Sequence, residues 1–192
     1  MSVAIPAARL SAAEFLAWER LQEARHEFHH GEVFAMAGGS LRHNAVAAAL
    51  IRDLGVALRG GSYRVLTSDQ RIAAPPGDRY AYPDVAVVCG RVELEAGTTD
   101  VLLNPSVIVE VLSKATEAYD RGAKWEGYRG LPSVQDYLLV SQGEAHIEHF
   151  QRQPDGSWRY AVAEVGGSVR LTSGVLVQLD SVFAGVFELA GE

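Results

Sequence analysis

The stretch VIVEVL at residues 107–112 decides the centre of the fold, because it encloses one glutamate, Glu110, in a run of apolar residues. A nearly continuous apolar run is typical of a central strand that is covered on both faces. An ionised carboxylate in such a strand is costly unless a partner or a cation compensates its charge. We therefore expect Glu110 to be a functional residue, with an arginine partner across the sheet as the structural alternative.

A second acid, Asp84, opens the apolar segment 85–88 and follows Tyr82 and Pro83. On its own it is consistent with an ordinary turn residue. If the two strands pair, however, the carboxylates of Asp84 and Glu110 lie side by side and raise each other's pKa. A divalent cation removes this conflict, and Mg²⁺ suits one or two carboxylates completed by water and phosphate oxygens. The pair predicts a magnesium site in which Mn²⁺ can substitute.

The basic residues point to the same part of the chain. The sequence has 17 basic residues, and only Lys114 and Lys124 are lysines. Asp120, Lys124 and Tyr128 are spaced i, i+4, i+8, so they share one face of a helix expected over residues 116–129. This spacing also fits a surface ion pair. As a functional residue, Lys124 would orient the attacking water and stabilise charge developing on phosphate; Lys114, expected in a loop, is the competing and less favoured lysine.

The rest of the chain predicts helices first, strands in the middle and a β-rich end. Ser11 and Glu14 form a capping box for a helix to about residue 24, and Ser40 caps a second helix that stops at Gly60. A short hairpin is expected over 27–34, and Asp180 can cap a final helical turn. Further strands are expected at 63–67, 70–74, 84–88, 106–112, 134–140 and 144–150, then short strands to about 179. We predict one α/β (α+β) domain over residues 1–192, with a mixed central β-sheet flanked by helices.

Composition limits the classes of protein that the chain can be. Its 192 residues fit one domain, and the one cysteine, Cys89, is expected to be buried and excludes an intrachain disulfide. No apolar stretch reaches the length of a membrane span, and no signal peptide is visible, so a reducing cytoplasm is expected. The net charge of −7 opposes nucleic-acid binding, so a local groove of arginines or a dimer would have to overcome it.

Taken in order, several segments resemble the Uma-type family of restriction endonucleases, which belongs to the PD-(D/E)XK nuclease superfamily. The resemblance covers most of residues 10 to 150, and the ordered set is specific although each piece alone is weak. The segments that carry it are 26–32, His43, 82–85, 105–113, Asp120 with Lys124 and Tyr128, and 134–140.

The resemblance implies a restriction-endonuclease-like core, metal binding at Asp84 and Glu110, and a homodimer. Many superfamily members carry lysine two residues after the second acid, where this chain has Leu112. The family is understood to have moved that lysine to the following helix, which matches Lys124. The family usually has proline at the position of Lys114, so the chain departs from the family there and Lys114 stays the alternative to Lys124.

Three further polar residues, Glu27, His43 and Asp69, correspond to positions that the family places around the site. Glu27 would complete the acidic cluster and His43 would contact phosphate or water. Each also has a simple structural explanation: Glu27 as a hairpin flank, His43 as a helix-capping or exposed residue, and Asp69 as a turn residue.

Two functions follow from these observations. The first is hydrolysis of DNA phosphodiester bonds, with Mg²⁺ held by Asp84 and Glu110, the backbone carbonyl of Val111 as a further ligand, and Lys124 positioning the water. The second is a catalytically inactive module for binding or assembly on the same fold, which the acidic net charge favours. Metal binding that depends on the two acids discriminates between them.

Overall fold

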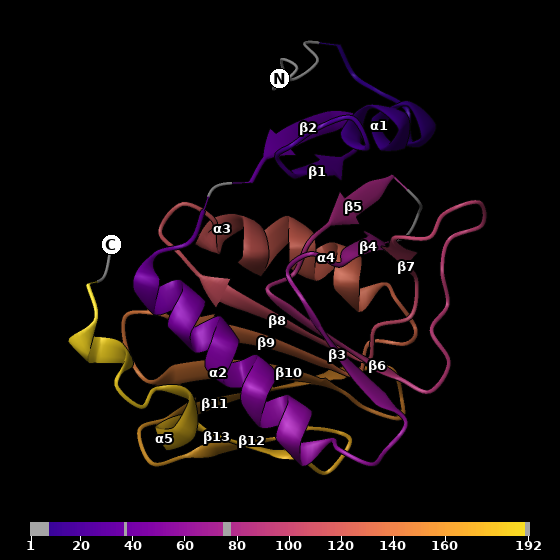
Figure 1. The fold of residues 1–192 in the computed structure, drawn as a ribbon. Coiled ribbons are helices and arrows are strands. Elements are labelled where there is room, and N and C mark those ends of the chain that lie inside the picture. The colour runs from indigo at the N-terminus through magenta and orange to yellow at the C-terminus, as the bar shows by residue number, and fades with distance from the viewer. Residues whose placement is uncertain (1–7, 37, 75–77, 191–192) are drawn as a thin grey trace.

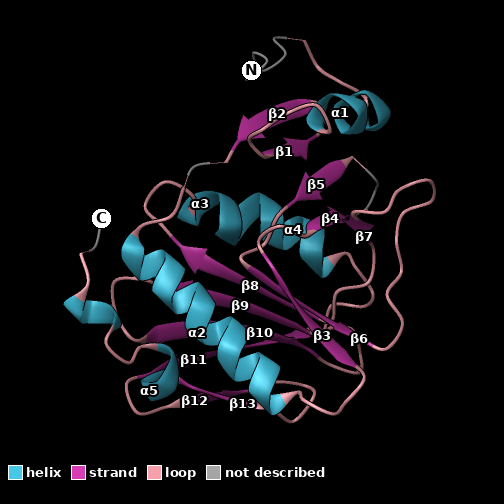
Figure 2. Cartoon of the chain, viewed as in Figure 1, coloured by secondary structure: helices cyan, strands magenta, loops and turns pink. Residues whose placement is uncertain are grey.

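A six-stranded mixed sheet forms the centre of the computed structural model, which describes residues 8–36, 38–74 and 78–190 (Figures 1 and 2). The strand order is β11-β10-β9-β8-β6-β3, and only the β8–β9 pair is parallel. The strands are β3 (Tyr63–Thr67), β6 (Val85–Cys89), β8 (Val107–Leu112), β9 (Asp136–Ser141), β10 (His146–Arg152) and β11 (Trp158–Glu164). The predicted mixed central sheet is confirmed.

Strand β8 is buried along its whole length, as its apolar run predicts. Its odd-numbered residues, such as Val109, join the core beneath helix α2 (Leu41–Ala57), which contributes Leu50. Its even-numbered residues, such as Ile108, join a second core with Tyr128 on the opposite face. Because side chains alternate along a strand, Glu110 belongs to this second face.

Helical residues 117–129 cover that second face (Figure 1). They form α3 (Glu117–Tyr119), a π-helical turn (Asp120–Lys124) and α4 (Trp125–Arg129). The predicted helix is therefore present, but its middle turn is wider than an α-helix. Helix α4 contains Gly127, although glycine is a weak helix former. Close packing explains this choice, because a Cβ at position 127 would lie 3.3 Å from the Cβ of Ala74.

A second, five-stranded sheet lies against the N-terminal helix α1 (Ala12–Glu19). Phe15 of α1 stacks on Phe28 with ring centroids 4.8 Å apart, and on Tyr80 at 5.7 Å. The strand order is β2-β1-β5-β4-β7, with β1 (His26–His29), β2 (Glu32–Ala35), β4 (Arg71–Ala74), β5 (Arg79–Ala81) and β7 (Val101–Leu102). The expected hairpin is present as the β1–β2 pair. The sequence does not predict that the strands divide into two sheets, because the periodicity of a strand does not identify the strand with which it pairs.

The C-terminal part returns to the face of the central sheet that carries α2. It comprises β12 (Ser168–Arg170), β13 (Leu176–Gln178), α5 (Leu179–Val182) and a 3₁₀ turn (Val186–Glu188). Val177 and Val182 join the core that contains Leu50. The expected β-rich end is confirmed, but Asp180 lies inside α5 and accepts a hydrogen bond from Gly166 N at 3.1 Å instead of capping the helix.

Two local predictions were wrong. Helix α1 ends at Glu19, because Glu19 turns inward and accepts the backbone N–H of His26 at 3.0 Å. Cys89 is exposed, since it is the last residue of β6 and extends past the buried part of the strand. Within the described ranges, no helix is long and apolar enough to cross a membrane.

Candidate active site

Strand pairing brings Asp84 and Glu110 to the same place. Strands β6 and β8 are antiparallel with Val85 opposite Val109, so continuing the register by one residue sets Asp84 opposite Glu110. The side chain of Asp84 is anchored there, because its Oδ2 accepts the backbone N–H of Val111 at 2.7 Å. The predicted juxtaposition of the two acids is therefore present in the fold.

Lys124 lies at the centre of a buried acidic cluster. Its Nζ is 3.1 Å from Glu110 Oε1, 3.1 Å from Glu27 Oε1 and 3.3 Å from Asp120 Oδ1. All four side chains are less than a tenth exposed. One ammonium group therefore stands among three carboxylates with little water to screen them.

The π-helical turn places two of these charges. It spans Asp120 to Lys124 and is wider than an α-helical turn. Tyr137 OH donates to the backbone carbonyl of Asp120, the first residue of this turn, at 2.9 Å. Lys124 Nζ also lies 5.6 Å from the ring centroid of Tyr119. Such single π turns occur often at functional sites.

Glu27 reaches the cluster from strand β1 of the second sheet. Its Oε1 accepts the backbone N–H of Tyr82 at 3.1 Å, two residues before Asp84. The hydroxyl of Tyr82 is itself held, since it donates to Glu19 Oε1 at 3.1 Å and accepts from Arg71 Nε at 2.8 Å. A buried network behind the site thus fixes both Glu27 and the segment that carries Asp84.

Two more side chains contact the acids directly. Tyr128 OH donates to Glu110 Oε1 at 3.2 Å. His43, in the first turn of α2, places its Nε2 3.3 Å from Asp84 Oδ2. Gly39 leaves room for this imidazole, because a Cβ at that position would lie 2.5 Å from His43 Nδ1 and the ring would have to shift.

The electrostatics of the cluster follow from burial and crowding. Burial raises the pKa of Glu110 well above its usual range, and the nearby carboxylates of Asp120 and Asp84 add to this while Lys124 opposes it. Burial alone would lower the pKa of Lys124, but the charges of Glu110 and Glu27 outweigh it and raise that pKa. Lys124 therefore carries its proton at neutral pH.

The structure brings together most of the residues that the sequence singles out: Glu27, His43, Asp84, Glu110, Asp120, Lys124 and Tyr128. Asp69 lies at the surface, where it pairs with Arg25, so it stands apart from this cluster. Lys114 lies in an exposed turn beyond β8 and is likewise outside it. Of the two lysines, the geometry favours Lys124.

The donor set fits a small, hard cation. Four carboxyl groups, those of Glu27, Asp84, Glu110 and Asp120, lie around one lysine and one histidine, so oxygen donors outnumber the basic groups. Within the described residues, no three His, Cys, Asp or Glu side chains are placed to hold one ion together. Asp84 and Glu110 would thus offer two carboxylates, and water or substrate oxygens would complete the coordination, as is common for Mg²⁺.

Sequence reasoning misses the supporting tyrosines. Tyr82 stands in the sequence as part of a Tyr-Pro-Asp motif, and its role appears once its backbone N–H is seen to hold Glu27. Tyr137 has the pattern of an ordinary strand residue, although its hydroxyl secures the π turn. No sequence signal identifies either role, because each depends on contacts between segments far apart in the chain.

Comparisons with known proteins identify the family and the fold of the chain. The family model described as "Uma2: Putative restriction endonuclease" matches residues 12–190. Two proteins of Synechocystis sp. (strain ATCC 27184 / PCC 6803 / Kazusa) are each 34% identical to the chain. "Uncharacterized protein slr1290" matches over 186 residues, 96% of this chain and 97% of that protein. "Uncharacterized protein sll1609" matches over 149 residues, 78% and 84% respectively.

A solved structure shares the fold. It is described as "a putative nuclease belonging to DUF820" from Anabaena variabilis ATCC 29413. The TM-score is 0.74 at 17% sequence identity, and the match covers 92% of this chain and 99% of that one. With the family match over nearly the whole chain, the expected resemblance is confirmed, and the chain belongs to the Uma2 family of restriction-endonuclease-like proteins.

Proposed function

We propose that the chain is a metal-dependent nuclease that hydrolyses phosphodiester bonds in DNA. The observation that carries the proposal is the buried cluster in which Lys124 contacts Glu27, Glu110 and Asp120, beside the paired acid Asp84. A fold that only needed stability would gain little from this arrangement, because buried charges rarely repay the cost of their desolvation. The descriptions of the family and of the solved relative support the same activity.

Asp84 and Glu110 are the residues that would hold Mg²⁺, with Mn²⁺ as a substitute. Such an ion supplies Lewis acidity, which makes water a better nucleophile and stabilises charge on phosphate oxygens. The backbone carbonyl of Val111 is proposed as a further ligand of the ion. The backbone N–H of the same residue donates to the Asp84 carboxylate and fixes it. Tyr128 OH donates to Oε1 of Glu110, the same oxygen that lies 3.1 Å from Lys124 Nζ.

Lys124 is proposed to act by charge. Because its pKa is raised, it stays protonated and serves as a hydrogen-bond donor instead of a general base. It would orient the attacking water and stabilise the negative charge that develops on the phosphate. His43 Nε2, 3.3 Å from Asp84 Oδ2, is proposed to contact water or phosphate.

The decisive experiment is a cleavage assay on supercoiled plasmid and on single-stranded DNA, with Mg²⁺, Mn²⁺ or EDTA. We expect cutting with either metal and none with EDTA. Glu110→Gln should abolish cutting and weaken Mg²⁺ binding measured by calorimetry, whereas Glu93→Gln, a matched change in an exposed loop, should do neither. Equal cutting by Glu110→Gln and the wild type would remove Glu110 from the mechanism.

The inactive module for binding or assembly is the second candidate, and the net charge of −7 favours it. If this candidate is right, the protein is folded in the same assays, but substitutions of Asp84 and Glu110 do not change its metal binding. We also propose a homodimer, since two copies can cut both strands of a duplex. Sedimentation velocity tests it, and a monomer at all concentrations would reject it.

A further inference from the structure

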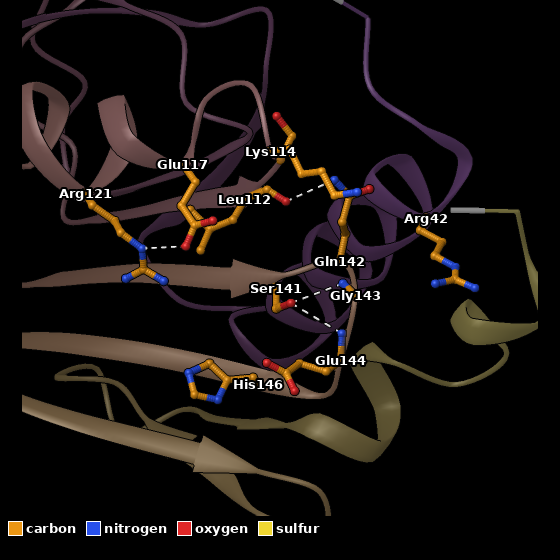
Figure 3. Close-up of a pocket in the computed structure, with 11 residues that line it drawn as sticks. Arg42, Leu112, Lys114, Glu117, Arg121, Ser141, Gln142, Gly143, Glu144 and His146 are labelled. Atoms are coloured by element: carbon orange, nitrogen blue, oxygen red, sulfur yellow. Dashed lines mark hydrogen bonds and ion pairs between the residues drawn. The ribbon is translucent and has the colours of Figure 1, made fainter. Parts of the chain in front are cut away.

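A cavity of about 420 Å³ at one end of the central sheet is lined mainly by polar side chains (Figure 3). In the figure, Arg121 lies at the left of the cavity, Arg42 at the right and Lys114 between them at the top. The remaining lining residues are Leu112, Ser113, Glu117, Ser141, Gln142, Gly143, Glu144 and His146.

The walls of the cavity continue the segments that carry the cluster. Arg42 precedes His43 in α2, Arg121 follows Asp120 in the π turn, and Leu112 lies two residues after Glu110 in β8. The cavity also lies where the parallel strands β8 and β9 end, since Leu112 and Ser141 both line it. Ligands of α/β sheets commonly bind outside the carboxyl ends of parallel strands.

The floor of the cavity is held by a fixed amide. Gln142 is only 8% exposed, and its Nε2 donates to the carbonyl of Leu112 at 3.0 Å. Its Oε1 accepts a hydrogen bond from Ser40 Oγ, the N-cap of α2. These bonds tie β8, the end of β9 and the start of α2 into one rigid frame around the cavity.

The two arginines of the cavity have partners of different kinds. Arg121 bridges Glu117 and Glu148, at 2.8 Å and 2.6 Å, so its charge serves to pin the helix on the sheet. Arg42 donates to the backbone carbonyls of Leu189 and Phe187, which are neutral and leave its charge in place. Lys114 lies in the exposed turn over the cavity. Together the lining places three positive charges, Arg42, Lys114 and Arg121, against the two carboxylates of Glu117 and Glu144, so it carries a net positive charge in a chain of net charge −7.

We infer that this cavity seats the DNA backbone next to the phosphate that is cut, with Arg42 and Lys114 as its phosphate contacts. The inference rests on the proposed function and adds the path of the substrate strand across the ends of β8 and β9. It assigns Lys114 a role in binding, which explains why this chain keeps a lysine outside the acidic cluster. Cations that contact phosphates release counterions from DNA and so make binding salt-dependent.

The test measures binding of a labelled 20-base-pair DNA by fluorescence anisotropy in EDTA over a series of salt concentrations. Lys114→Gln should lower the slope of log affinity against log salt by about 0.9, the value for one lost contact with duplex DNA. Arg42→Gln should do the same. Arg59→Gln is the matched control, because it removes the same charge beyond the opposite end of α2 and should bind like the wild type. If Lys114→Gln and Arg42→Gln both bind like Arg59→Gln, the inference is wrong.

Cleavage kinetics separate this inference from the proposed function. Lys114→Gln should raise KM more than it lowers kcat, whereas Asp84→Asn should abolish kcat. If the wild type cuts DNA and both cavity variants keep its DNA affinity and its KM, only the inference about the cavity is overturned. A wild type that binds DNA with the expected salt slopes but never cuts it would overturn the nuclease proposal and keep the cavity as a binding site. Arg42→Gln also loses its contacts to the C-terminal carbonyls and could unfold for that reason. In that case Lys114→Gln, a change in an exposed turn, decides the test alone.

Discussion

The carboxylate of Asp84 accepts the backbone N–H of Val111 at 2.7 Å, so the first acid of the cluster is fixed by the strand that carries the second. This bond holds Asp84 in position without using the side chain of Glu110. It separates two properties of Asp84 that one substitution usually confuses: its negative charge and its role as a hydrogen-bond acceptor.

Asp84→Asn and Asp84→Ala should therefore differ in stability but not in activity. Asparagine keeps an oxygen that can accept the Val111 N–H, whereas alanine leaves this backbone donor without its partner and costs about 1–3 kcal/mol. Both variants lose the charge that would hold the metal, so both should cut DNA at least about 100-fold more slowly. Urea unfolding and plasmid cleavage measure the two effects; an active Asp84→Asn enzyme would show that the charge is not needed.

Lys124→Met should destabilise the fold strongly, because it leaves Glu27, Glu110 and Asp120 without their shared cation. Breaking a buried ion pair by removing one partner costs about 3–5 kcal/mol. The double variant Lys124→Met/Glu110→Gln should recover part of this loss, since it removes one of the uncompensated carboxylates. Chemical denaturation of the two variants provides the measurement, and equal stability of the single variant and the wild type would contradict the balance of charge described above.

The central strand and the paired acids could be predicted because their signals are local. An apolar run that contains Glu110 identifies a buried strand and an unusual charge at once, and Asp84 repeats the pattern at the start of another strand. The i, i+4, i+8 spacing places Asp120, Lys124 and Tyr128 on one face even though the helix includes a π turn. These features depend on alternation and spacing alone.

The remaining features depend on contacts between distant segments. The second sheet, the reach of Glu27 to Lys124 and the surface position of Asp69 follow from which strands pair, and the periodicity of a strand does not encode its partner. The exposure of Cys89 follows from where β6 passes the edge of the core. Segments 72 residues apart in the sequence, those of Arg42 and Lys114, line the cavity together, so no local sequence pattern predicts it.

The ion pair between Arg121 and Glu148 should make stability depend on acid pH. The hydrogen bond from Arg121 holds the pKa of Glu148 below its usual value, although partial burial opposes this. The folded state therefore prefers the ionised carboxylate, and the stabilisation is present above the pKa of the unfolded state. It is lost as pH falls through the lower pKa of the folded state. Between pH 7 and pH 3, the unfolding temperature Tm should fall less steeply for Glu148→Gln than for the wild type. Parallel plots of Tm against pH for the two proteins would show that this ion pair does not link stability to pH.

Two glycines of one helical segment should respond oppositely to alanine. Gly122 is exposed in the π turn, and a Cβ added there would meet no atom within 4 Å beyond its chain neighbours and the backbone of its own helix. Gly122→Ala should therefore stabilise the protein by about 0.5–1 kcal/mol through helix propensity and lost chain entropy. Gly127 is buried, and a Cβ there would lie 3.3 Å from Ala74 Cβ, which belongs to strand β4 and cannot move freely.

Gly127→Ala should therefore lose that gain and push α4 away from the second sheet. Because Tyr128 is the next residue, the shift would also lengthen its 3.2 Å hydrogen bond to Glu110. We expect a lower free energy of unfolding than for Gly122→Ala and a slower cleavage rate, while Gly122→Ala keeps the wild-type rate. Urea titrations and single-turnover cleavage compare the two variants directly, and a Gly127→Ala protein that is both more stable and fully active would show that α4 does not need its close approach to β4.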